Sequence, residues 1–559
     1  MKTTFKYDHY FDYEELSNNL IRLSEEYPDL MELQVNCTTE EGRKQYLAIL
    51  TNKKTGDMLE KPGFYLDGNI HAGEVTASMC AMHTVDYLLS NYSNNEEVRE
   101  ILDEMTIYCI PRVSPDGAEV YLKSPYGIRS VNRTTCEEKG GIREEDLDDD
   151  GVIRMMRIQT PYGAWKKDPK DEELMVLRNP GDRNGDFYDI YPEGLLEAYD
   201  GSENLKVKKE EWGLDFNRNF PYGWCPEPRQ DGAGVYPLSN PETKAIADFV
   251  LSHPNIGAAA LGHTSGGLLL YPPGTKASQK SFEEDIKVLK AIARMGEEEL
   301  GYKPLNVYDS FLGSKENYDS GALDDWLFET KGIPAYTMEF WDIATKAGMP
   351  VKWGPEKEDV YESLKRFAAI LKWVKENAPQ YYTGWKKVTH PDFGEVEIGG
   401  FNYKFTQQNP PEAFLQQECE ADTCFNLRFI NALPRLAIDT VKSEMISDGI
   451  YRIEAVIGNL GYLSTALTKT GLFNKYVKPV KVVLEAENTL SGKKETEIEE
   501  LQGYSSTLTG VFYYGNITTE KSASARKKLV WIVKGNKGDT LTIRASQEKA
   551  GRVEHTITL

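Results

Sequence analysis

Three residues of this sequence have the types and the setting of ligands to a catalytic metal ion. His71 and Glu74, in the segment GNIHAGEV, follow an apolar run typical of a strand, at the point where a helical pattern begins. His263 ends a second apolar run, AAALGH, where a polar ring is unexpected unless it binds something. Zinc prefers imidazole and carboxylate ligands, and a catalytic zinc takes three of them and leaves one position open for water. The sequence therefore predicts one zinc ion held by His71, Glu74 and His263.

Two further segments carry charged or polar residues in settings that suggest a function. Glu339 ends the apolar run AYTMEF, where a carboxylate is costly to bury without a partner. The segment GLDFNRNFP places Asn217 and Arg218 side by side. An arginine guanidinium has the planar shape that binds a carboxylate through two hydrogen bonds. The structural alternatives are a buried ion-pair partner for Glu339 and an ordinary loop arginine for Arg218.

The first two thirds of the chain show the alternation of strand-like and helical patterns that is typical of an α/β domain. The expected strands cover residues 45–51, 63–70, 106–113, 256–263 and 335–340. The expected helices cover residues 74–92, 241–253, 283–301 and 361–378. Because His71, His263 and Glu339 all follow apolar strands, we expect them to gather at the carboxyl edge of a mixed, twisted sheet flanked by helices.

The change of pattern along the chain predicts two domains. A catalytic domain is expected over 1–380, with an insertion at about 134–212 that is rich in charged residues, Gly and Pro. A linker is expected over 381–410, followed by an all-β, sandwich-like accessory domain over 411–559 with about seven strands. The runs that suggest these strands include 424–433, 451–460, 477–486, 510–517, 528–535 and 539–547.

The insertion contains part of a second metal-binding pattern. Asp146, Asp148 and Asp150, followed by Gly151, repeat the first half of a calcium-binding loop. The acidic residue expected at the twelfth position is instead Arg157. Two interpretations stay open, a bound Ca²⁺ ion and a solvated acidic turn, and the incomplete pattern favours the turn.

Taken together, these motifs resemble the zinc metallocarboxypeptidases of the carboxypeptidase A/B family. The resemblance covers roughly residues 5–380 and depends on five separated motifs in order, which are HAGE, PRVSPDG, GLDFNRNFP, ALGHTSGGLLLYP and the pair NYDSGALDDW with AYTMEFWD. It implies a zinc carboxypeptidase-like fold and hydrolysis of the C-terminal peptide bond of peptides. It also implies that Glu339 is the general base, which takes a proton from a zinc-activated water.

The resemblance assigns residues that would hold the substrate. Asn217 and Arg218 would bind its free terminal carboxylate, which makes the enzyme an exopeptidase. Tyr318 matches the tyrosine that caps the bound substrate, although the run from Tyr318 to Trp326 is one residue shorter here. Asp324 falls near the position that lines the specificity pocket, where an acid would favour a C-terminal Lys or Arg. Its alternative role is at a helix start, where acids are stabilising.

An arginine that stabilises the oxyanion is implied shortly after the Pro-Asp-Gly turn. Arg129 and Arg133 are both candidates there, and Arg157 in the insertion is a third. Arg129 is favoured because its distance from the turn fits the family's spacing best. Gly73 stands where some digestive members have an arginine, so a secondary substrate contact is expected to be missing.

Composition limits the partners. The formal net charge of −23 argues against a nucleic-acid binder and against docking on an anionic membrane. The first residues lack the apolar core of a secretory signal, and no run approaches a membrane span. Seven scattered cysteines indicate a reducing setting. The expectation is a cytoplasmic enzyme whose partner is a peptide with a free C-terminus; its oligomeric state is not indicated.

Two other functions remain open at this point. A related zinc amidohydrolase would act on cell-wall stem peptides or on acyl-amino acids. The Asn217–Arg218 pair favours a substrate with a free α-carboxylate. A non-catalytic, peptidase-like binding protein would have lost a ligand or the base, whereas every essential residue type is present here.

Overall fold

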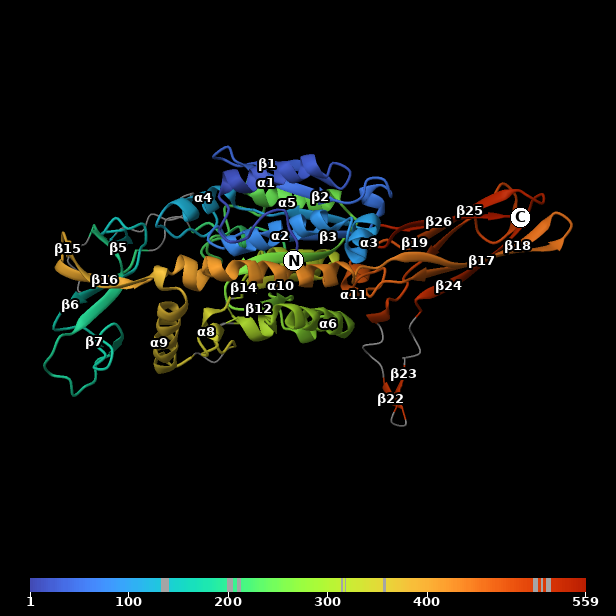
Figure 1. The fold of residues 1–559 in the computed structure, drawn as a ribbon. Coiled ribbons are helices and arrows are strands. Elements are labelled where there is room, and N and C mark those ends of the chain that lie inside the picture. Colours follow the sequence, from blue (N-terminus) through green and yellow to red (C-terminus); the bar gives the residue numbers. More distant parts are fainter. Residues whose placement is uncertain are drawn as a thin grey trace.

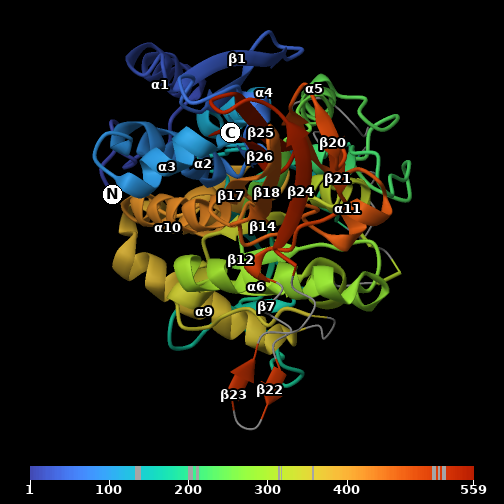
Figure 2. The ribbon, with the colours of Figure 1, turned by 90° about the vertical axis from the view of Figure 1, so that its right-hand side faces the viewer.

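The computed structural model describes residues 1–559 except 132–139, 199–204, 209–212, 313–314, 317, 355–357, 506–510, 514–515 and 519–523. Arg133, one of the candidate oxyanion arginines, therefore lies outside the described residues. Figure 1 shows a central body with a smaller sheet at one end and a β-rich region at the other. Figure 2 looks along the molecule from the β-rich end.

The central body contains an eight-stranded mixed sheet with the order β1-β2-β4-β3-β11-β14-β12-β13. The strands β4, β3, β11 and β14 run parallel, and β12 is antiparallel to β14. The predicted fold class is thus confirmed. The bounds are β1 (Met31–Thr38), β2 (Lys44–Leu50), β3 (Gly63–Gly68), β4 (Thr106–Ile110), β11 (Ile256–Thr264), β12 (Leu268–Tyr271), β13 (Lys303–Asn306) and β14 (Ala335–Phe340).

Helices pack against this sheet. The long helix α2 contacts β3 and β11 and is covered in turn by α10, whereas α1 and α5 contact β1 and α6 contacts β12 and β13. Nearly every residue of α2 is buried, because the helix packs between the sheet and α10. The bounds are α1 (Tyr13–Glu26), α2 (Val75–Asn91), α3 (Glu96–Glu104), α4 (Pro115–Lys123), α5 (Pro241–Ser252), α6 (Glu283–Leu300), α7 (Leu323–Asp325), α8 (Ile343–Lys346), α9 (Val360–Asn377), α10 (Glu412–Ile430) and α11 (Lys469–Phe473).

The helix α10 contradicts one prediction. The run at 424–433 was expected to be a strand, but most of it is the last part of α10. Phe425 and Phe429 are four residues apart, so they share one helix face, and both rings are buried. Phe429 packs edge-on against Phe64 of β3, with the ring centroids 5.3 Å apart. The prediction was wrong because every second residue from 425 to 429 is apolar, which is also the spacing of a strand.

A second sheet joins the insertion to the residues expected as a linker. It has six strands in the order β15-β16-β6-β9-β7-β8, and a separate pair is formed by β5 and β10. Ile142, Met156, Val396 and Ile398 form its small core, so the insertion is not a bare loop. The bounds are β5 (Gly141–Glu144), β6 (Met155–Gln159), β7 (Trp165–Lys167), β8 (Met175–Leu177), β9 (Tyr188–Pro192), β10 (Gly194–Glu197), β15 (Tyr382–His390) and β16 (Gly394–Phe401).

The C-terminal region consists of two antiparallel four-stranded sheets, β17-β18-β24-β20 and β21-β19-β25-β26, as the sequence predicted for an all-β domain. Side chains from both sheets share one core, which includes Ile453, Trp531, Val482 and Ile543. The run at 510–517, expected as one strand, contributes two, β22 (Val511–Tyr513) and β23 (Asn516–Thr518). The other bounds are β17 (Leu436–Ser447), β18 (Ile450–Asn459), β19 (Val480–Glu485), β20 (Thr489–Ser491), β21 (Glu495–Ile498), β24 (Arg526–Lys534), β25 (Thr540–Gln547) and β26 (Gly551–Thr558).

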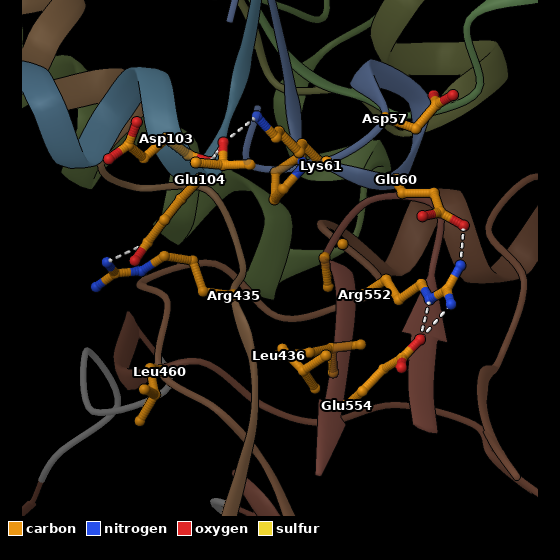
Figure 3. A pocket seen from close by; sticks show the side chains of 16 residues that line it. Asp57, Glu60, Lys61, Asp103, Glu104, Arg435, Leu436, Leu460, Arg552 and Glu554 are labelled. Carbon is orange, nitrogen blue, oxygen red and sulfur yellow. Dashed lines mark hydrogen bonds and ion pairs between the residues drawn. The ribbon is translucent and has the colours of Figure 1, made fainter. Parts of the chain in front are cut away.

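A polar pocket of about 520 Å³ lies where the C-terminal sheets meet the central body. In Figure 3, Arg552 lies between Glu60 and Glu554, and its Nη1 is 2.5 Å from Glu60 Oε1. Arg435 pairs with Glu104 across the same pocket at 3.2 Å. Both arginines of this junction are therefore paired with glutamates. Among the described residues, no helix is both long and apolar enough to cross a bilayer.

Candidate metal centre and active site

The sheet topology brings the predicted ligands to one edge. Gly68 at the end of β3 lies opposite Gly262 of the parallel strand β11, and His263 lies opposite Glu339 of β14. Three neighbouring strands therefore end together, as expected for a site at the carboxyl edge of an α/β sheet. The Asn69 side chain donates hydrogen bonds to the carbonyls of His71 and Ala72. These bonds fix the turn that carries His71 from β3 into α2.

The three predicted ligands converge on one point. His71 Nδ1 is 3.0 Å from Glu74 Oε1, His263 Nδ1 is 3.0 Å from Glu74 Oε2, and the two Nδ1 atoms are 3.1 Å apart. Two nitrogen ligands of a tetrahedral zinc ion lie roughly 3.4 Å apart, which is close to this spacing. All three residues are buried, and their ligand atoms all lie within 4.8 Å of one another. The donor set fits a zinc ion.

The charges at this point favour a bound cation. Burial alone would raise the pKa of Glu74, but the two histidines hold it well below its ordinary value. Conversely, burial would lower the pKa of His263, but the Glu74 carboxylate raises it to about 9. The pKa shifts of both groups therefore favour positive charge between them.

A buried carboxylate that the sequence reading missed connects the metal site to an arginine. Asp215 Oδ1 lies 3.0 Å from His71 Nε2, and Asp215 Oδ2 accepts a hydrogen bond from Arg129 Nε at 2.8 Å. Despite burial, Arg129 holds the pKa of Asp215 well below its ordinary value. A carboxylate behind a histidine ligand orients the ring toward the metal. Its position directly before Phe216, Asn217 and Arg218 was the available indication in the sequence.

Of the three candidate oxyanion arginines, the structure places Arg129 beside the metal ligands. Its Nη1 lies 3.9 Å from Glu74 Oε1, and 38% of its side chain is exposed. Arg157 lies instead in β6, where its Nε donates to Glu397 Oε2 at 2.8 Å and its guanidinium covers the Trp385 ring. Arg157 is therefore committed to the six-stranded sheet and is not available to the substrate.

Glu339 lies at the end of β14 next to the metal ligands. Burial raises the pKa of its carboxyl to about 7, and the charge of Glu74 adds to this effect. Part of the residue still reaches solvent. A carboxylate with a raised pKa binds a proton readily and releases it near neutral pH, which suits a general base.

Asn217 and Arg218 connect the metal site to the segment before α7. They belong to a short 3₁₀ helix, Phe216–Arg218, whose first turn is capped by Asp215. Asn217 Oδ1 accepts a hydrogen bond from the Leu323 amide at 2.9 Å. Arg218 Nη2 lies 3.0 Å from Asp319 Oδ2, and 14% of its side chain is exposed. The guanidinium is thus held in place with donors remaining for a ligand.

The two other predicted substrate residues occupy the same region. The Tyr318 ring packs against Arg229, with the guanidinium carbon 4.8 Å from the ring centroid. Asp324 is buried in the first turn of α7, and burial raises the pKa of its carboxyl, although the charges of His263 and Arg218 oppose the shift. Both residues therefore belong to the segment that contains Asp319, the ion-pair partner of Arg218. Asp324 is buried.

The acidic turn of the insertion differs from the predicted set. Asp146 and Asp148 approach Glu193, a residue the sequence reading did not consider, within the reach of one ion. Asp150 instead pairs with Arg154 at 2.6 Å, and Lys386 lies 3.2 Å from Asp148. Acidic groups of this kind are common without an ion. The predicted calcium set of Asp146, Asp148 and Asp150 is therefore not the group that the fold assembles.

Comparison with known proteins agrees with this geometry. The family described as zinc carboxypeptidase matches residues 16–353, more than half of the chain, and a domain of unknown function matches 435–558. Carboxypeptidase B of Astacus astacus is 33% identical over 377 residues, which is 65% of this chain and 97% of that protein. Carboxypeptidase O of Bos taurus is 23% identical over 364 residues, 64% of this chain and 72% of that protein.

Among solved structures, carboxypeptidase A from Helicoverpa armigera is 15% identical, with 67% of this chain and 76% of that chain covered and a TM-score of 0.39. A likeness of this size carries no argument about the site. The family match and the Astacus relative confirm the resemblance inferred from the motifs. The chain belongs to the zinc carboxypeptidase family.

Proposed function

We propose that this chain hydrolyses the last peptide bond of a peptide held by its free terminal carboxylate. The observation that carries the proposal is the convergence of His71, Glu74 and His263 on one point, at the same sheet edge as Glu339. A zinc ion held by these ligands would acidify a water molecule and polarise the scissile carbonyl. The other groups of the site would transfer the proton, stabilise the oxyanion and bind the substrate.

Glu339 is placed to move the proton. It accepts the proton of the attacking water and passes it to the leaving amine, for which its raised pKa is suited. Arg129, oriented by its hydrogen bond to Asp215, donates to the oxygen on which negative charge develops. Asp215 therefore positions two groups at once, because it also contacts His71.

Arg218 and Asn217 form the part of the site that recognises the C-terminus of the substrate. The Arg218 guanidinium offers its remaining donors to the terminal carboxylate, and Asn217 fixes the adjoining segment through the Leu323 amide. Tyr318 would cover the bound residue. Asp324, buried on the Arg218 side, favours a C-terminal Lys or Arg by charge complementarity.

The proposal is tested by a matched pair of substrates. A short peptide ending in Lys and its C-terminal amide are incubated with the zinc-loaded enzyme, with and without a chelator. The expected result is release of free Lys from the acid, lost on chelation and at least hundredfold slower for the amide. Equal cleavage of the acid and the amide would favour an amidase, and cleavage that survives complete metal removal would refute the zinc mechanism.

A further inference from the structure

A segment outside the family match reaches the metal site. The residues Lys404–Gln408 form one helical turn that follows β16, beyond the matched range of 16–353. Gly73 lies between the ligands His71 and Glu74, and a Cβ atom there would approach Gln408 Nε2 to 2.7 Å. The Gln408 side chain therefore occupies the space beside Gly73 that a larger side chain would need.

The contact of this segment with the ligand turn is specific. Asn409 is fully buried; its Nδ2 donates to the Gly73 carbonyl at 2.8 Å, and its Oδ1 accepts from the Thr76 amide at 3.0 Å. Lys404 Nζ donates to the carbonyls of Tyr121 and Ser124 at 2.6 and 2.7 Å. The segment is thus fastened both to the start of α2 and to the end of α4.

These contacts enclose a pocket of about 490 Å³ that borders His71 and Arg129. One wall is the end of α4 with the residues after it, a second is the start of β6, and the third is the segment after β16. The strands β6 and β16 pair with each other, with Met155 opposite Gly399, so the second and third walls meet. The residues that line the pocket include Ile128, Met155, Phe401, Tyr403 and Gln408.

The pocket adjoins the metal site on a side that the predicted carboxylate-binding residues do not line. Arg218 and Asn217, which would hold the terminal carboxylate, contact Asp319 and Leu323. A peptide whose carboxylate is bound there has its scissile bond at the metal ligands. Because His71 and Arg129 line this pocket, whereas Asn217 and Arg218 do not, the pocket is a space beside the metal ligands for the chain on the other side of that bond.

We propose that this pocket holds the acyl part of the substrate and restricts it to about one to three residues, since its volume is that of a small-ligand site. The inference rests on the proposed function and narrows its substrate class to short peptides. Gln408 Oε1 accepts from the Tyr121 hydroxyl at 2.9 Å, which orients the amide so that Nε2 donates to a substrate carbonyl. Ile128, Phe401 and Tyr403 offer apolar contacts to the side chains.

The first test is a series of peptides that share the same C-terminal residue and carry acyl parts of one, two, three, five and eight residues. The expected kcat/KM is highest for the short acyl parts and at least tenfold lower for eight residues. Values equal within twofold across the series would overturn this inference but leave the proposed function standing. If no member is cleaved, the proposed function itself fails.

The second test removes a large side chain, Tyr403, from the wall of the pocket formed by the segment after β16. Tyr403 is about half exposed, at 51%, so Tyr403→Ala should fold. The ratio of kcat/KM for the eight-residue acyl part to that for the one-residue part is expected to rise at least fivefold. Tyr361→Ala on α9, exposed at 59% and outside the pocket lining, is the matched control and should keep the wild-type ratio. A Tyr403→Ala ratio equal to the control's would overturn the assignment of this wall.

Discussion

Two pockets of this molecule are similar in size, about 490 and 520 Å³, and both contain charged groups, yet their chemistry differs. At the junction with the C-terminal sheets, Arg552 is neutralised by Glu60 and Glu554, and Arg435 pairs with Glu104. At the metal site, by contrast, ligand atoms of His71, Glu74 and His263 all lie within 4.8 Å of one another. Donor atoms that converge on one point can hold a cation, and the volume of a pocket does not by itself provide this.

The pockets also lie at opposite ends of the same strand. Lys61 and Pro62, which line the junction, directly precede β3, whereas His71 follows its end. Lys549 of the C-terminal region reaches the first residue of β11, donating to the Ile256 carbonyl at 2.6 Å. The C-terminal region therefore contacts the amino edge of the sheet, whereas the metal ligands lie at its carboxyl edge. Figure 1 shows the C-terminal region at one end of the central body.

Removing a metal ligand should cause the largest loss of activity of all the substitutions considered in the two regions. His263→Ala leaves two ligands, so zinc is expected to be lost and peptide cleavage to fall to background. Zinc content by elemental analysis and cleavage of the Lys-ending peptide measure the result. The control is His9→Ala, at an exposed histidine near the N-terminus. A His263→Ala enzyme that keeps one zinc per chain would contradict the assigned ligands.

The second largest effect is expected at Glu339, the proposed general base. Glu339→Gln keeps the shape of the side chain but cannot accept the proton, so kcat is expected to drop roughly 100- to 10,000-fold while the zinc content is unchanged. Steady-state kinetics with the same peptide measure the loss. If kcat stays within tenfold of wild type, Glu339 is not the base.

The oxyanion arginine should have a smaller effect. Arg129→Ala removes a donor at the developing charge, and kcat is expected to fall roughly 100- to 1000-fold with little change in KM. The control is Arg143→Ala, a partly exposed arginine of β5 that pairs with Glu145. An increase in KM with kcat unchanged would mean that Arg129 only binds the substrate.

The pH dependence follows from the same carboxylate. Glu339 must be ionised to act as a base, and its pKa is raised to about 7 before the positive charge of a zinc ion lowers it. Activity is therefore present above the pKa and is expected to fall about tenfold per pH unit below it. The measurement is kcat/KM between pH 4 and pH 9, and a profile that is flat over the acid range would argue against this role.

The smallest effect is expected at the junction. Arg552→Ala breaks ion pairs on a partly exposed side chain, so the free energy of unfolding should fall by only about 0–1 kcal/mol. Since the substitution lies at the other end of β3, kcat/KM should stay within twofold of wild type. A tenfold loss of activity would show that the two ends of the sheet are coupled.

Much of the site could be predicted from the sequence alone. His71, His263 and Glu339 follow apolar runs, and a polar side chain at the end of a buried strand is a local pattern that short segments reveal. Apolar runs of this kind predicted β2, β3, β4, β11 and β14 of the central sheet, because burial on both faces requires nearly continuous apolar sequence. The strands β1, β12 and β13 were not predicted. The alternating C-terminal runs likewise predicted the antiparallel sheets.

Other features were decided only by the tertiary structure. Asp215 contacts His71 across 144 residues, and Gln408 reaches Gly73 from a segment expected to be a linker. The strand-like run in α10 became a helix because its two phenylalanines fit the surface formed by other segments. Local sequence fixes where strands end and which polar groups stand there. Which distant groups meet them depends on packing across the whole chain, which no short segment encodes.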